Sequence, residues 1–250
     1  MRSYCYFVAI LCFAAGVVSA VALGQSGATA PRTYPVTWSP DLKLKSLADI
    51  PARLKRRFSA KELDELRAEG WEGIPGESDD IPHTCGELLE RSDTSRLGMQ
   101  CAALRALKTA VPAKRSFVHD LPWTPGLFSL LPMNSAWSNG SLVNLAEAKE
   151  PDEAFAAGME KGLSIREFWP YAKYTLNKFG DLVQDEGSEN WTAAYIKYAS
   201  GDFNGDGLED ILIWATGGMA HTLEHPSNLY LLTRTEPGSG RKLTLIRRLH

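Results

Sequence analysis

The chain has 250 residues, of which 27 are Lys or Arg and 30 are Asp or Glu, so its formal net charge is −3 at pH 7. This nearly balanced charge gives no electrostatic reason to expect a nucleic-acid partner, because nucleic-acid-binding proteins concentrate basic residues on one surface. Hydrophobic residues make up 44% of the chain, which is enough for a core in one large domain or two small ones.

The first twenty residues have the layout of a secretory signal peptide. Arg2 precedes an apolar stretch that ends at Ser19-Ala20, and we expect cleavage after Ala20, with cleavage after Gly24 as the second choice. The stretch is shorter than the roughly 20 residues of a spanning helix, so no stable membrane span is expected after cleavage. The mature protein is predicted to be periplasmic or secreted, and residues 21–44 are predicted to form an extended leader.

Two of the four cysteines lie in the signal peptide, which leaves Cys85 and Cys101 in the mature chain. In an oxidising compartment two thiols usually form a disulfide, so we predict that this pair is bridged. Two separate buried thiols are the alternative, because sequence carries no information on the geometry that a disulfide needs. A cysteine nucleophile is accordingly not expected.

Residues 45–186 are predicted to be a mainly helical region. Ser59 and Glu62 have the spacing of a capping box, and Leu63 and Leu66 follow at helical spacing. Further helices are expected at 84–90, 98–110, 152–162 and 164–168, and a loop or a set of short strands at 120–140. The predicted disulfide would then join two helices.

Residues 187–250 are predicted to be an antiparallel β region. Strands are expected at 191–198, 211–216, 229–233 and 242–249, with a turn at Glu236–Arg241. Ile211–Ala215 is apolar at every position, so this strand should be covered on both faces by packing against the N-terminal part. The expected fold class is α+β, with a helical N-terminal part packed on a C-terminal antiparallel β-meander.

The segment with the sharpest chemistry is residues 202–210, Asp-Phe-Asn-Gly-Asp-Gly-Leu-Glu-Asp. Oxygen-bearing side chains occupy loop positions 1, 3, 5 and 9, and glycine occupies position 6, which is the spacing of a calcium loop. Three carboxylates within nine residues repel one another unless a cation or solvent separates them. A polar β-turn is the simpler interpretation, since Asp-Gly favours a hairpin by itself.

This loop resembles that of the FG-GAP and VCBS-type repeats, although it occurs only once in the chain. The resemblance implies that the side chains of Asp202, Asn204, Asp206 and Asp210 and the backbone carbonyl of Leu208 bind Ca²⁺. It also implies that Glu209 points outward to solvent. An EF-hand would need Glu at position 12, where this chain has Ile213, so the loop should join two strands and the Ca²⁺ should be structural rather than catalytic.

His221–His225 matches the H-x-x-E-H pattern of zinc proteases, which requires a helix that places both imidazoles on one face. Pro226 disfavours helical dihedrals at His225, and the neighbouring segments are predicted strands. We therefore expect a polar surface loop at this segment.

His119-Asp120 could form a catalytic dyad, with Ser116, Ser129 or Ser135 as the nucleophile. No Gly-x-Ser-x-Gly nucleophile elbow accompanies the pair. A turn residue and a cap are the simpler interpretation of these two side chains.

An export signal, a single calcium-type loop and a C-terminal meander resemble the general layout of the periplasmic inhibitor and immunity proteins that bacteria use against cell-wall-degrading enzymes. The resemblance implies a module that binds another extracytoplasmic protein and is not an enzyme. A protruding loop at Ala136–Leu142 or Gly217–Ser227 would then enter the active site of the partner. Trp123 and Trp137 are the tryptophans most suited to a binding face.

The alternative function is that of an exported hydrolase acting on cell wall or polysaccharide. Its site would be assembled from residues distant in sequence. His119, Asp120, His221 and His225 are the candidates for that site.

Overall fold

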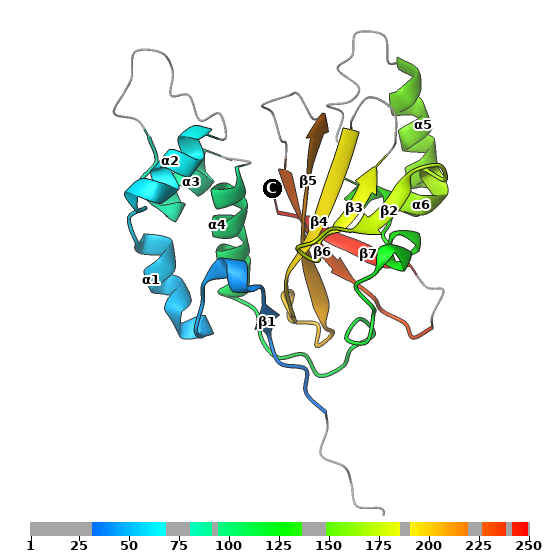
Figure 1. The fold of residues 1–250 in the computed structure, drawn as a ribbon. Coiled ribbons are helices and arrows are strands. Elements are labelled where there is room, and N and C mark those ends of the chain that lie inside the picture. The colour runs from blue at the N-terminus through cyan, green and yellow to red at the C-terminus, as the bar shows by residue number, and fades with distance from the viewer. Residues whose placement is uncertain are drawn as a thin grey trace, which may run out of the picture. The chain divides into compact units, whose positions relative to one another are not determined.

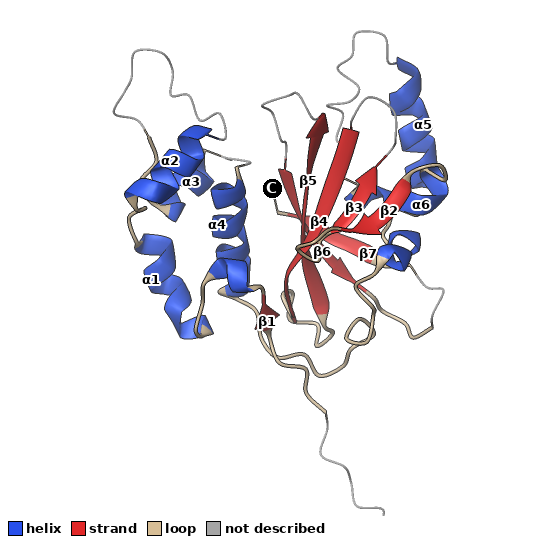
Figure 2. Ribbon diagram, viewed as in Figure 1, coloured by secondary structure: helices blue, strands red, loops and turns tan. Residues whose placement is uncertain are grey.

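An antiparallel sheet of seven strands, together with short helices, makes up the described part of this computed structural model, which comprises residues 32–68, 81–91, 95–136, 149–185, 191–219, 227–238 and 242–249. The fold class is α+β, as predicted (Figure 2). The predicted signal peptide and part of the leader lie outside these ranges. Within these ranges, no helix combines the length and the apolarity needed to cross a membrane.

The predicted C-terminal meander is confirmed, and each of its four segments is a strand. The strands are β1 (Thr37–Trp38), β2 (Lys173–Leu176), β3 (Leu182–Asp185), β4 (Trp191–Gly201), β5 (Asp210–Met219), β6 (Ser227–Thr233) and β7 (Thr244–Arg248). Their order is β2-β3-β4-β5-β6-β7, and all neighbours are antiparallel. β1 pairs with the C-terminal end of β4.

The sheet begins earlier in the chain than residue 187, because β2 and β3 precede it. Each of these strands has four residues, which is too short for a clear alternating pattern. They are held in the sheet because β2 pairs with β3, and β3 pairs with residues 192–195 of β4. Pairing with a long strand adds to the strand propensity of residues such as Tyr174, Thr175 and Val183.

β5 is covered on both faces, as the apolar run Ile211–Ala215 predicts. Leu212 and Trp214 belong to one hydrophobic cluster, and Ile211, Ile213 and Ala215 belong to a second one. Successive side chains of a strand point to opposite faces, so the two clusters lie on opposite sides of the sheet.

Helices from two parts of the chain cover these two faces (Figure 1). α1 (Ile50–Lys55), α2 (Ala60–Ala68), α3 (Cys85–Glu90) and α4 (Arg96–Leu107) contribute to the first cluster. α5 (Lys149–Glu160), α6 (Ile165–Phe168) and the 3-10 helix Pro125–Ser129 contribute to the second cluster. The tract 120–140 therefore contains short helical turns, at Pro125–Ser129 and Met133–Ser135, and no long strand among its described residues.

Two sequence signals in the helical part are confirmed. Cys85 and Cys101 form a disulfide that joins α3 to α4. At the start of α2 the capping box is complete, because the Glu62 amide donates to Ser59 Oγ at 3.3 Å and the Ser59 amide donates to Glu62 Oε2 at 2.8 Å.

Candidate calcium site

The loop 202–210 connects β4 to β5, so it joins two strands as predicted. Asp202 anchors the turn, since its Oδ1 accepts the Gly205 amide at 2.6 Å and its Oδ2 accepts the Gly207 amide at 2.8 Å. Gly205 and Gly207 have φ values of 82° and 83°, a left-handed conformation that costs free energy in residues with a side chain. The glycine at position 6 is therefore required by the turn.

Asn204 and Asp206 continue the same pattern of side-chain caps on the loop backbone. Asn204 Oδ1 accepts the Asp206 amide at 3.0 Å, and Asp206 Oδ1 accepts the Leu208 amide at 2.7 Å. The amide of Asn204 also donates to Asp206 Oδ2 at 3.0 Å. These bonds curl the backbone around the carboxylates, so that loop positions 1, 3 and 5 are fixed relative to one another.

Asp210, the last predicted ligand, is fully buried, with 0% of its surface exposed. Its Oδ2 accepts the Phe203 amide at 3.1 Å, whereas its Oδ1 has no hydrogen-bond partner. The pKa of Asp210 is raised to about 6, chiefly by burial and in smaller part by the charges of Asp206 and Asp202, while the hydrogen bond from the Phe203 amide offsets part of the rise. A bound cation would offset both the buried charge and the repulsion.

The outer side of the loop is held by residues 111–115, which follow α4. Asp202 and Val111 exchange two backbone hydrogen bonds of 2.9 Å. The carbonyl of Gly207 accepts the amides of Lys114 and Arg115 at 2.9 and 3.0 Å. These bonds tie the loop to a segment nearly a hundred residues earlier in the chain. Within the described ranges, no three His, Cys, Asp or Glu side chains form a group that could hold a metal ion as they stand.

The prediction that Glu209 points to solvent is wrong, because its side chain is 2% exposed. The Glu209 amide donates to the Arg115 carbonyl at 2.9 Å, and this hydrogen bond places Glu209 beside residues 115–119. Its Oε2 lies 3.5 Å from His119 Nδ1. The charge of Glu209 also acts on half-buried Lys197: burial lowers the pKa of Lys197, and Glu209 raises it in part. No local signal in the sequence indicates these partners.

The other nominated residues are not assembled into one site. Asp120 is exposed, while His119 faces Glu209 and the ring of Tyr34, with ring centroids 5.1 Å apart. Ser116 Oγ accepts the amide of His119 at 2.8 Å, so this serine caps a turn. Ser135 Oγ donates to the Pro132 carbonyl at 2.7 Å, and exposed Ser129 ends a 3-10 helix.

Several nominated residues fall outside the described ranges, namely His221, His225, Trp137, most of the loop 136–142 and residues 220–226 of the loop Gly217–Ser227. Trp123 is described, and its indole Nε1 donates to the Gly180 carbonyl at 3.2 Å, in the turn between β2 and β3. The neighbouring Phe179 is 76% exposed.

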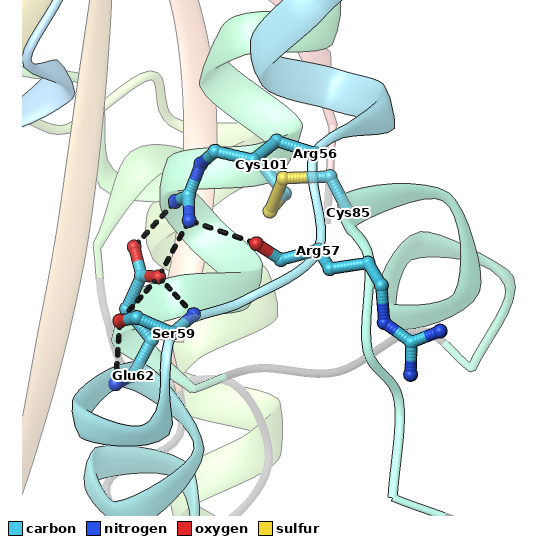
Figure 3. A network of polar contacts seen from close by, with 6 residues as sticks. All are labelled: Arg56, Arg57, Ser59, Glu62, Cys85 and Cys101. Atoms are coloured by element: carbon cyan, nitrogen blue, oxygen red, sulfur yellow. Dashed lines mark hydrogen bonds and ion pairs between the residues drawn. A yellow bond between two sulfur atoms is a disulfide. The ribbon is translucent and has the colours of Figure 1, made fainter.

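A second polar network lies beside the disulfide (Figure 3). The guanidinium of Arg56 donates to both carboxylate oxygens of Glu62, at 2.9 and 2.6 Å. Together with the bonds from Ser59, this ion pair lowers the pKa of Glu62 to about 2. The network links the end of α1 to the start of α2.

No protein-family model, no curated protein and no solved structure matches this chain.

Proposed function

We propose that this chain is an exported calcium-binding protein, with Ca²⁺ held by the loop 202–210 as a structural ion. The observation that carries the proposal is the buried, unpaired Oδ1 of Asp210, which lies in a loop that also contains the carboxylates of Asp202 and Asp206. Unpaired buried carboxylate oxygens are costly, and coordination to a cation removes that cost.

The donor set is made of oxygen atoms, which suits a hard cation. The side chains of Asp202, Asn204, Asp206 and Asp210 and the carbonyl of Leu208 would hold it. Ca²⁺ accepts six to eight oxygen ligands in flexible geometry, whereas Mg²⁺ demands a near-ideal octahedron. A loop of mixed carboxylate, amide and carbonyl donors therefore favours Ca²⁺.

Thermal unfolding of the full chain in excess Ca²⁺ and in chelator tests the site. A ligand that binds only the folded state raises the melting temperature by mass action, and about 100-fold saturation over Kd contributes about 2.7 kcal/mol. A melting temperature that is the same in both conditions would remove the calcium proposal. Mg²⁺ in place of Ca²⁺ is the matched control and should shift the melting temperature much less.

We further propose that the protein acts by binding another extracytoplasmic protein, as an inhibitor or immunity protein would. The disulfide between Cys85 and Cys101 supports an oxidising compartment. Phe179 is 76% exposed and Leu176 is 44% exposed, and both lie at the β2–β3 connection, whose Gly180 carbonyl accepts the Trp123 indole N–H. Exposed aromatic residues on a rigid hairpin are typical of interface anchors.

Affinity capture from periplasmic extract, followed by assays of muramidase inhibition, tests this role. Phe179→Ser should abolish capture and inhibition without lowering the melting temperature. Met159→Ser, at a 42% exposed position of α5, is the matched control and should leave both unchanged. The absence of any stable partner and of inhibition in the wild type would contradict the proposal.

An exported hydrolase of cell wall or polysaccharide is the second candidate function. The observation that favours it is the buried carboxylate of Glu209 at 3.5 Å from Nδ1 of the half-exposed His119, since a nearby carboxylate stabilises the protonated imidazole of a general base. His119→Ala should then abolish turnover of a wall substrate, whereas Asp120→Asn should not. If His119→Ala turned over the substrate as fast as Asp120→Asn and the wild type, this function would be excluded.

A further inference from the structure

A small cavity beside the Cys85–Cys101 disulfide has a polar wall made of Arg53, Arg56 and Gln100. The rest of its lining is apolar and consists of Leu42, Phe58, Cys85, Leu97, Cys101 and Leu104. The cavity has a volume of about 10 Å³, which is enough for a single small group of about the size of a water molecule.

Arg56 uses only part of its guanidinium for the ion pair with Glu62 (Figure 3). Its two terminal nitrogens donate to the carboxylate, and Nη1 also donates to the Arg57 carbonyl at 2.9 Å. Its Nε is buried and has no hydrogen-bond partner. One N–H donor of this cation is therefore left for another group.

Arg53 lies about one turn earlier on α1 and adds a second guanidinium. Its Nε is also buried without a hydrogen-bond partner. Burial lowers the pKa of Arg53, the charge of Arg56 lowers it further, and the charge of Glu62 raises it in part. Arg53 and Arg56 carry two positive charges, and Glu62, which is ion-paired with Arg56, carries one negative charge, so these three side chains have a net charge of +1.

We propose that this cavity binds a single small inorganic anion, such as chloride, through the Nε–H groups of Arg53 and Arg56. A buried donor without a partner is costly, and a monovalent anion satisfies both donors and neutralises the excess charge. The small volume favours a monatomic anion over phosphate or sulfate. The proposal is independent of the calcium site, because it involves no residue of the loop 202–210.

Crystals of the full chain soaked in sodium bromide test the site, since bromide replaces chloride and scatters anomalously. We expect an anomalous peak within hydrogen-bonding distance of both Nε atoms. A map with bromide peaks elsewhere on the molecule and none in this cavity would overturn the proposal.

Thermal unfolding at matched ionic strength gives a solution test. The wild type should melt about 2–4 °C higher in sodium chloride than in sodium gluconate, because gluconate is too large for the cavity. Arg53→Met, which keeps the aliphatic stem, should lose this difference. Arg57→Met is the matched control, because the Arg57 guanidinium is exposed and points away from Glu62 in Figure 3.

An equal chloride-specific difference in the wild type and in Arg53→Met would contradict the proposal, as would no difference in the wild type. If Arg53→Met does not fold, the bromide map of the wild type decides the question alone.

Discussion

Replacing Asp210 by Asn should change stability in opposite directions in chelator and in calcium. The substitution keeps the shape of the side chain and an acceptor for the Phe203 amide, but it removes the charge. In the calcium-free protein that charge is unfavourable, because the carboxylate is fully buried and its Oδ1 has no hydrogen-bond partner. We therefore expect Asp210→Asn to be more stable than the wild type in chelator.

The magnitude follows from the pKa of Asp210, which burial raises from 3.8 to about 6. The difference is about 2 pKa units, and each unit corresponds to about 1.4 kcal/mol, so ionisation at neutral pH costs the folded state about 3 kcal/mol. An amide in the same place must still be desolvated. The expected gain for Asp210→Asn in chelator is therefore about 1–3 kcal/mol in the free energy of unfolding.

The pH dependence has a definite sign. The folded state of the calcium-free wild type holds the Asp210 proton more tightly than the unfolded state, because the folded pKa of about 6 lies above 3.8. The stability contributed by the Asp210 proton is fully present below pH 3.8 and is lost as the pH rises through about 6. Asp210→Asn should lack this decline. In excess calcium the wild type should be more stable than Asp210→Asn, because the cation binds the ionised carboxylate and stabilises only the wild type.

Urea unfolding of the wild type and Asp210→Asn at neutral pH, in chelator and in excess Ca²⁺, measures these differences. Asp120→Asn is the matched control, because Asp120 is exposed and lies outside the loop. The reasoning would be refuted if Asp210→Asn were destabilised in chelator by as much as in calcium.

Three further predictions concern the stability of other features. Glu62→Gln should lower the free energy of unfolding by about 1–2 kcal/mol, after allowing for solvent at Arg56, which is 35% exposed. Because the pKa of Glu62 is lowered from 4.5 to about 2, this stabilisation is present above pH 4.5 and is lost as the pH falls through about 2. The urea unfolding midpoints of the variant and the wild type should therefore converge in acid. Gly207→Ala should lower the free energy of unfolding by about 1 kcal/mol because of its φ of 83°; steric clash adds nothing, since the nearest atom to the added Cβ is 3.7 Å away. The same variant should bind calcium more weakly in calorimetry. An unchanged calcium affinity would contradict the role of the turn. The double variant Cys85→Ala, Cys101→Ala should lose about 3 kcal/mol, as expected for a loop closed over 16 residues, and reductant should then have no further effect on its melting temperature.

Local features of this protein could be predicted from sequence because their causes are local. The capping box of Ser59 and Glu62 and the four strands of the meander depend on residues a few positions apart. The disulfide could be predicted because only two cysteines follow the predicted signal peptide. The all-apolar run Ile211–Ala215 predicted burial on both faces for the same reason, since a strand alternates its side chains.

The tertiary structure alone decided which side chains meet across long distances in the chain. Glu209 was expected in solvent by its place in a calcium-type loop, and it is buried because backbone pairing with Arg115 turns it toward His119. β2 and β3 belong to the sheet because β3 pairs with the long strand β4, and two segments of four residues do not reveal that pairing by themselves. In each case a contact between two separate segments decides the outcome, and periodicity and motif spacing carry no information on such contacts.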